Sequence, residues 1–194
     1  IASEGPFKKG SNATYLFNYR YSTFGLIQSL LPANSGVPIY QDLSFKLNFP
    51  LKKGNISVWG IGSTDNYPQP PINDSSKWET SYDRNYFDWN LKMGAAGVAY
   101  KLLLGKQTYL NTTIAGTGTI NHMDEKRFDD SMISRQNWLF TDNSSKIIVN
   151  TFLNHRFNKK LTLRTGLFYH TLYYKLDLNA TINDDPATFQ NYVK

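Results

Sequence analysis

Strict alternation of apolar and polar residues is the feature of this sequence that most limits its fold. The segment 42–49 is the clearest case, and its apolar positions are Leu43, Phe45, Leu47 and Phe49. Because successive side chains of a β-strand point to opposite faces, such a segment has one apolar and one polar face. Similar patterns at 14–22, 56–63, 89–102, 108–121, 147–157 and 161–173 predict about seven strands. Helical periodicity is limited to residues 24–31, where we expect at most a short helix.

The predicted connections between these segments alternate between short and long. Short turns are expected at 51–55, 104–107 and 157–160, and lysines mark them at equal spacing, namely Lys53, Lys106 and Lys159. The segment 6–10 resembles 50–54 and predicts another short turn before the first strand. Long connections are expected at about 23–38, 64–85 and 122–145. Tight turns at one end of a meander and long loops at the other are typical of a bacterial outer-membrane β-barrel.

The composition fits a barrel and excludes a transmembrane helix. Aromatic residues make up 15% of the chain and hydrophobic residues only 40%, and no stretch approaches the roughly 18 apolar residues of a spanning helix. A barrel keeps mean hydropathy low because its lumen face is polar. We therefore predict an all-β fold: an antiparallel up-and-down meander that forms a segment of a large transmembrane β-barrel with short periplasmic turns and long extracellular loops. Residues 1–194 are expected to form one partial barrel domain without a plug domain.

The alternation also predicts which side chains share a face in the first two of these strands. One face, expected to meet lipid, carries Tyr15, Phe17, Tyr19, Leu43, Phe45 and Leu47. The opposite face, expected to point into the lumen, carries Asn18, Arg20, Asp42, Lys46 and Asn48. If these faces are assigned correctly, the polar set would contact a plug or a ligand.

Four segments carry a resemblance to a known family. Residues 4–11 and 15–22 resemble early barrel strands, and 37–46 and 106–113 resemble later barrel strands, of TonB-dependent outer-membrane receptors of the Bacteroidetes type. The resemblance implies an outer-membrane barrel of roughly 22 strands with its lumen blocked by a plug. It also implies nutrient uptake driven by the inner-membrane TonB complex, and a surface lipoprotein as a partner. The chain would supply about a third of the barrel wall and pair with the remaining strands, and it reads as an internal piece of a longer protein.

Ligand contact is expected on the long loops. Flat aromatic surfaces lie there next to polar residues, and the candidates are Tyr67, Trp78, Tyr82, Arg84 and Trp138. Such rings suit stacking against sugars, but they suit loop anchoring equally well. A siderophore, a glycan and a peptide all remain open as the transported substrate, and the formal charge of +6 does not choose among them.

The sequence offers no recognisable catalytic or metal-binding pattern. The absence of cysteine excludes disulfides, iron–sulfur ligation and a cysteine nucleophile. The three histidines lie far apart, and the acidic residues Asp124, Glu125, Asp129 and Asp130 lack the spacing of a calcium loop. We expect no enzymatic activity, no cofactor, no metal and no nucleic-acid partner.

The alternative prediction is a soluble or surface-exposed all-β binding module, for example one that binds carbohydrate. Strands of soluble sandwiches also alternate and carry Tyr, Phe and Trp. A passive pore is a third reading. Dependence on detergent separates the first two, because a barrel wall should aggregate without it.

Overall fold

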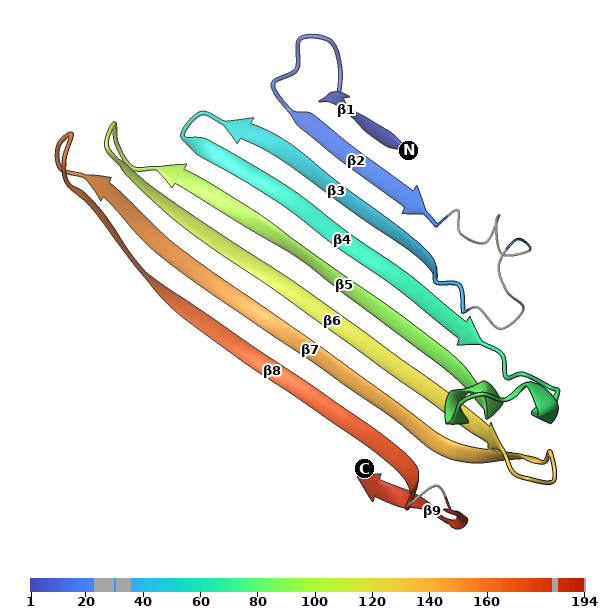
Figure 1. Ribbon diagram of the computed structural model, residues 1–194. Coiled ribbons are helices and arrows are strands. Elements are labelled where there is room, and N and C mark those ends of the chain that lie inside the picture. Colours follow the sequence, from blue (N-terminus) through green and yellow to red (C-terminus); the bar gives the residue numbers. More distant parts are fainter. Residues whose placement is uncertain (23–29, 31–35, 183–184, 194) are drawn as a thin grey trace.

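The chain folds as one curved antiparallel sheet in a single layer (Figure 1). The computed structural model describes residues 1–22, 30, 36–182 and 185–193. Each strand pairs with the next one in sequence, and in the described residues β1 and β9 form the two open edges. The strands are β1 (Ala2–Pro6), β2 (Thr14–Tyr21), β3 (Ile39–Leu51), β4 (Gly54–Gln69), β5 (Asn85–Leu103), β6 (Thr108–Phe128), β7 (Ser134–Arg156), β8 (Thr162–Ile182) and β9 (Asp185–Val193).

The predicted all-β meander is confirmed, and the seven predicted strands correspond to β2 through β8. The outer strands β1 and β9 were not predicted because neither has a clean period of two. The short turn predicted at residues 6–10 is confirmed as the connection between β1 and β2. The predicted helix at 24–31 lies outside the described residues except for Leu30.

One predicted long loop is wrong. Strand β6 continues to Phe128 and β7 begins at Ser134, so a short turn replaces most of the expected connection at 122–145. The polar residues there pair across the strands; for example, His122 Nδ1 and Thr141 Oγ1 lie 2.8 Å apart. The Asp129 carboxylate closes the turn by accepting hydrogen bonds from the backbone of Ser131 and Ile133. Both strands therefore continue beyond their alternating segments, and in these outer parts polar side chains pair across the strands where no apolar face is present.

Two short 3-10 helices, η3 (Ser75–Lys77) and η4 (Ser81–Arg84), lie in the remaining long connection between β4 and β5. They sit at the long-loop end of the sheet, on the right in Figure 1. In the described part of the chain, no helix is long and apolar enough to cross a membrane.

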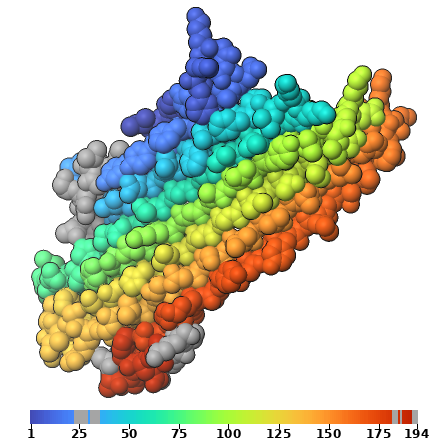
Figure 2. Space-filling view, turned by 180° about the vertical axis from the view of Figure 1, so that it is seen from behind, coloured from blue at the N-terminus to red at the C-terminus, as the bar shows by residue number. Residues whose placement is uncertain are grey.

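The tight turns shift along the sheet, by three residues between β2 and β3 and by three more from β3 to β8. Directly paired residues form a row across the sheet that runs from Thr14, the first residue of β2, to Phe168 in β8. Strand β8 begins at Thr162, six residues before Phe168. On average, the turn ends therefore move by about one residue for each strand crossed. With about 3.3 Å per residue along a strand and about 4.8 Å between strands, the row of turns slopes by roughly 35°. Figure 2 shows the strands as parallel diagonal bands.

The sheet has almost no interior. Among the described residues, the only buried apolar side chains are Val37, Ala115 and Ala180. Large apolar side chains remain open, and Leu167 and Tyr169, which share one face of β8, are 76% and 62% exposed. Because a sheet must bury its apolar face against another layer, these side chains require a covering that the described residues do not supply.

Candidate functional site

Strand register sorts the side chains onto two faces. We call the side of the sheet that carries Phe45 face A and the side that carries Ser44 face B. The predicted groupings are confirmed, because Tyr15, Phe17 and Tyr19 lie opposite Leu47, Phe45 and Leu43. The register does not by itself say what either face contacts.

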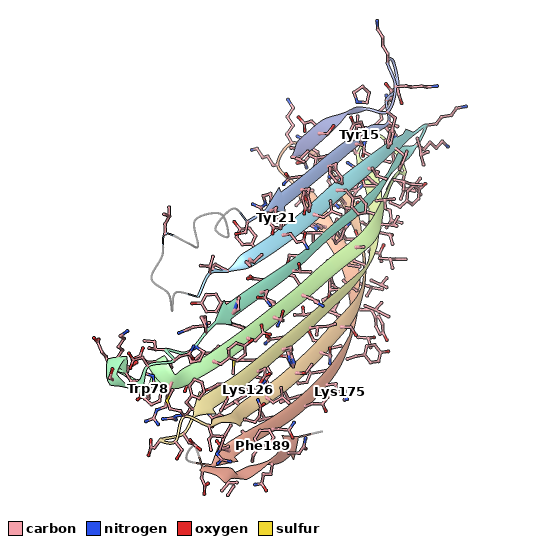
Figure 3. The ribbon with its side chains drawn as sticks, turned by 90° about the vertical axis from the view of Figure 1, so that its right-hand side faces the viewer. Tyr15, Tyr21, Trp78, Lys126, Lys175 and Phe189 are labelled. Atoms are coloured by element: carbon pink, nitrogen blue, oxygen red, sulfur yellow. The ribbon has the colours of Figure 1, made fainter. Side chains whose placement is uncertain are left out.

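Face A carries a continuous apolar band across six strands. The band runs over alternate residues of 43–51, 54–62, 94–102, 110–120, 145–153 and 163–173. Each of these stretches is nine to eleven residues long, and none places Lys, Arg, Asp or Glu on face A. Many side chains in the band are exposed, including Val98, Ile114, Ile147 and Leu167. Figure 3 shows side chains standing out from the sheet along the strands.

A shallow hollow of about 830 Å³ lies within face A near the long-loop end of the band. Its floor includes Gly62, Gly94 and Gly118, and a Cβ atom added at any of these three would find nothing closer than 3.6 Å. Its rim includes Tyr19 and Tyr173. The hollow thus lies where the apolar band meets polar side chains, because its lining also includes Lys92 and Lys175.

The band ends at a polar row on the long-loop side. In this row the Asn66 amide donates to Asn90 at 2.7 Å, and Asp177 pairs at 3.0 Å with Lys175, which lies in the row before it. The register aligns the row across β4 to β8, and its members are Asn66, Asn90, His122, Thr141 and Asp177. Face A therefore changes from apolar to polar along one line across the sheet.

The opposite end of the band is bounded by lysines. All four tight turns carry exposed lysines, namely Lys8, Lys9, Lys52, Lys53, Lys106, Lys159 and Lys160. The turn half of the sheet, residues 4–16, 46–59, 97–115 and 148–170, holds eleven basic residues and one acidic residue, Glu4. The other fourteen acidic residues lie in the rest of the chain. The long-loop end is consequently acidic relative to the turn end.

Face B is polar where the sequence predicts it to be. The five residues predicted to face a lumen lie on this face: Asn18, Arg20, Asp42, Lys46 and Asn48. Arg20 Nε donates to both carboxylate oxygens of Asp42, at 2.9 and 3.0 Å. Asn48 accepts a hydrogen bond from Ser57, whose hydroxyl accepts one from Asn55. These contacts join β2, β3 and β4 through side chains on one face.

The structure does not gather the five predicted ligand-binding residues into one site. Arg84 lies over the ring of Trp78, with 5.2 Å to the ring centroid, and donates to Asp130 at 3.2 Å. Tyr82 is 65% exposed and its ring meets Phe87. The other two, Tyr67 in β4 and Trp138 in β7, are separated by two strands.

Trp78 has a clear role as a loop anchor. Its indole Nε1 donates to the Ile72 backbone oxygen at 2.7 Å, so its polar atom is already used within the loop. The label in Figure 3 places Trp78 at the long-loop end. Of the two predicted roles, ligand stacking and loop anchoring, the described contacts of Trp78 support loop anchoring.

Asp83 holds the connection around η4 together. Its Oδ2 accepts hydrogen bonds from the backbone of Thr80 and Glu79, at 2.6 and 2.8 Å. These bonds favour the carboxylate and lower the pKa of Asp83 below its usual value of 3.8, with the Thr80 bond as the larger cause. A lowered pKa means that the stabilisation is complete above the usual pKa and is lost as pH falls through the lowered one.

We expect Asp83→Ala to loosen this connection at neutral pH. Amide hydrogen exchange of Glu79 and Thr80 should become about tenfold faster because both amides lose a charged acceptor. Hydrogen exchange followed by mass spectrometry of the peptide 72–84 checks this. Asp185→Ala in β9 removes the same charge elsewhere and should leave the peptide unchanged; equal protection in all three proteins would contradict the assignment.

The acidic residues noted at 124–130 are engaged with neighbouring donors. Asp124 and Glu125 are consecutive in β6 and point to opposite faces, and Glu125 accepts from the Asn85 amide at 2.8 Å. Asp129 accepts from Arg135 at 2.8 Å. In the described residues, no group of three or more His, Asp or Glu side chains converges as a metal site.

Sequence reasoning missed a small pocket on face B at the long-loop end. It lies over β4 and β5 beside the residue that precedes β3, has a volume of about 220 Å³, and is lined by Pro38, Asp65, Tyr67, Trp89 and Leu91. Only Tyr67 among these was predicted as a ligand contact. In the sequence these side chains occupy the alternate positions 65 and 67 and the alternate positions 89 and 91. They come together only because β4 pairs with β5 with Tyr67 opposite Trp89.

Comparison with protein-family models, with curated proteins and with solved structures finds no match to this chain.

Proposed function

We propose that this chain forms part of the barrel wall of a TonB-dependent receptor that takes up a nutrient across the bacterial outer membrane. The observation that carries the membrane part is the apolar band on face A. Its stretches of nine to eleven residues match the roughly 9–11 residues that a tilted strand needs to cross the hydrocarbon layer. Lipid would supply the covering layer that the apolar side chains require.

The slope of the tight turns supports the same proposal. If the turns lie level with one membrane surface, the strands must tilt by roughly 35° from the membrane normal, close to the 35–45° of membrane barrels. The length of the apolar stretches and the slope of the turns therefore both agree with tilted strands in a barrel wall.

The two boundaries of the band fit membrane surfaces. Long lysine side chains at the turns can place their ammonium groups in water or among headgroups while their stems stay in an apolar layer. At the other boundary, the row from Asn66 to Asp177 places hydrogen-bonding groups where the band ends. We assign the turn end to the periplasmic side and the long-loop end to the outside.

The open edges call for partner strands. Unpaired backbone groups at an edge cost several kcal/mol each in lipid, so an open sheet is not stable there. In the proposed receptor, further strands of the barrel pair with β1 and β9, and face B looks into the lumen. There the Arg20–Asp42 pair and the Asn48–Ser57 contact would meet a plug domain or the ligand.

The uptake part of the proposal rests on the resemblance of segments 4–11, 15–22, 37–46 and 106–113 to barrel strands of these receptors. In such a receptor a plug coupled to the inner-membrane TonB complex would drive transport, and a surface lipoprotein could cap the loops. This chain would contribute wall and mouth and no catalytic step.

Cysteine labelling tests the membrane part directly, because the chain contains no cysteine of its own. Single cysteines at Leu43, Val98 and Ile114 on face A should resist a water-soluble maleimide in the native membrane. Their neighbours on face B, Ser44, Ala99 and Thr113, should react. Equal labelling of both sets would overturn the membrane assignment and favour the soluble binding module.

Intact mass tests the receptor part. The protein isolated from outer membranes should have a mass several times 22.2 kDa, and peptide mapping should find plug peptides upstream of Ile1. A membrane protein of 194 residues would refute the receptor and leave the lipid-facing band to another assembly.

A further inference from the structure

The face B pocket of Pro38, Asp65, Tyr67, Trp89 and Leu91 has the features of a binding site for a cation. Its volume of about 220 Å³ equals the space of about seven water molecules at ~30 Å³ each. That is room for a small organic ion. Asp65, Tyr67, Trp89 and Leu91 project from one face of the paired strands β4 and β5, so the backbone pairing fixes their relative positions, and Pro38 lies just before β3.

Asp65 supplies a carboxylate without a counter-charge. It is half-buried, its Oδ1 is shielded from solvent, and that atom accepts no hydrogen bond in the described structure. A carboxylate that has lost part of its hydration gains most from a charged partner. On the same face, Arg20 directs its Nε at both carboxylate oxygens of Asp42, and no ion pair joins it to Asp65 in the described residues.

The chain next to the pocket cannot provide the missing charge. Residues 23–35, which precede its Pro38 wall in sequence, contain no Lys, Arg or His. Lys92, the neighbour of Leu91, lies on face A. The described surroundings and the composition of the adjoining segment therefore leave the carboxylate available to a ligand.

The two aromatic walls are held in place. Trp89 donates from Nε1 to Asn121 Oδ1 at 2.6 Å, and the Asn121 amide donates to Asp142 at 3.1 Å, which orients the indole. Tyr67 rests on Gly36, where an added Cβ would lie 2.5 Å from the ring. Rings fixed beside a carboxylate form a preorganised surface for a positive charge.

We propose that this pocket binds the ammonium group of a small organic cation. A metal ion is disfavoured because hard cations need several oxygen ligands, and the pocket offers one carboxylate and two aromatic rings. An ammonium carrying methyl or methylene groups uses both features, since its charge meets Asp65 while its carbon atoms meet Trp89 and Tyr67. The pocket lies on face B, so the inference does not depend on what covers face A.

Calorimetric titration of the full chain with choline tests the proposal, in maltoside detergent if detergent is needed and without phosphocholine detergents. Choline should bind at one site, and its neutral carbon isostere 3,3-dimethyl-1-butanol should bind at least tenfold more weakly. Asp65→Asn keeps the shape and removes the charge, and it should weaken choline binding at least tenfold. Trp89→Leu keeps much of the bulk and should also weaken it.

Asp177→Asn is the matched control. It removes an aspartate from the adjacent cross-strand row on the opposite face, and choline affinity should stay within twofold. No choline binding to the unmodified chain, equal binding of the neutral isostere, or equal affinity in Asp65→Asn would each overturn the proposal. Hydrogen exchange of the Asp65→Asn variant confirms that the sheet is intact, so a loss of binding reports on the charge.

Discussion

Replacing Phe45 with arginine is expected to destabilise the membrane-inserted sheet by roughly 2–4 kcal/mol. Phe45 lies in the interior of the apolar band on face A, in register with Phe17 and Gly60. Its ring covers Gly60, where an added Cβ would meet the ring at 2.6 Å. An arginine there would place a charge in the hydrocarbon layer and also remove this cover from the glycine.

The neighbouring substitution Ser44→Arg is the control for this effect. Ser44 precedes Phe45 in β3 and points to face B, where Lys46 already sits in the same strand. Urea unfolding from phospholipid vesicles, followed by tryptophan fluorescence, should show a loss of less than about 1 kcal/mol for this variant. Equal losses for the two arginines would show that lipid does not contact face A.

The strands and the two faces were predictable because they depend on local alternation. Leu43 and Phe45 share a face in any β-strand, whatever the rest of the chain does. The extents of β6 and β7 were not predictable in the same way. Their outer parts pair through polar contacts such as His122 with Thr141, and those contacts exist only once the register is set.

The candidate binding residues also show that local alternation could be predicted, whereas contacts between strands could not. Sequence reasoning named aromatic loop residues as candidate ligand contacts but could not place them relative to one another, and Tyr67 and Trp138 lie two strands apart. It also found no role for Asp65 or Trp89 in binding, since a carboxylate in one strand and an indole in the next meet only through the pairing of β4 with β5. Alternation assigns a residue to a face, whereas a site needs the register between strands as well.

Register also predicts a second large effect, at Gly166 in β8. Gly166 lies opposite Phe152 of β7, and an added Cβ would lie 2.2 Å from the Thr151 backbone oxygen and 2.6 Å from Phe152 Cβ. Arg164 also stacks on the Phe152 ring, with 3.9 Å to the centroid. Gly166→Ala must therefore push the two backbones apart and disturb this stack. We expect a loss of about 1–3 kcal/mol in the free energy of unfolding.

Gly116→Ala separates this steric effect from the general effect of replacing a strand glycine. An added Cβ at Gly116 meets nothing within 4 Å, so this variant should be neutral or more stable by about 0.4–1 kcal/mol, because alanine restricts the unfolded chain. Urea titration of both variants under one condition measures the difference. If Gly166→Ala proved as stable as Gly116→Ala, β7 and β8 could not approach as closely at Phe152 as the sheet requires. That result would contradict the close backbone approach at Gly166 and the steric origin of the expected loss.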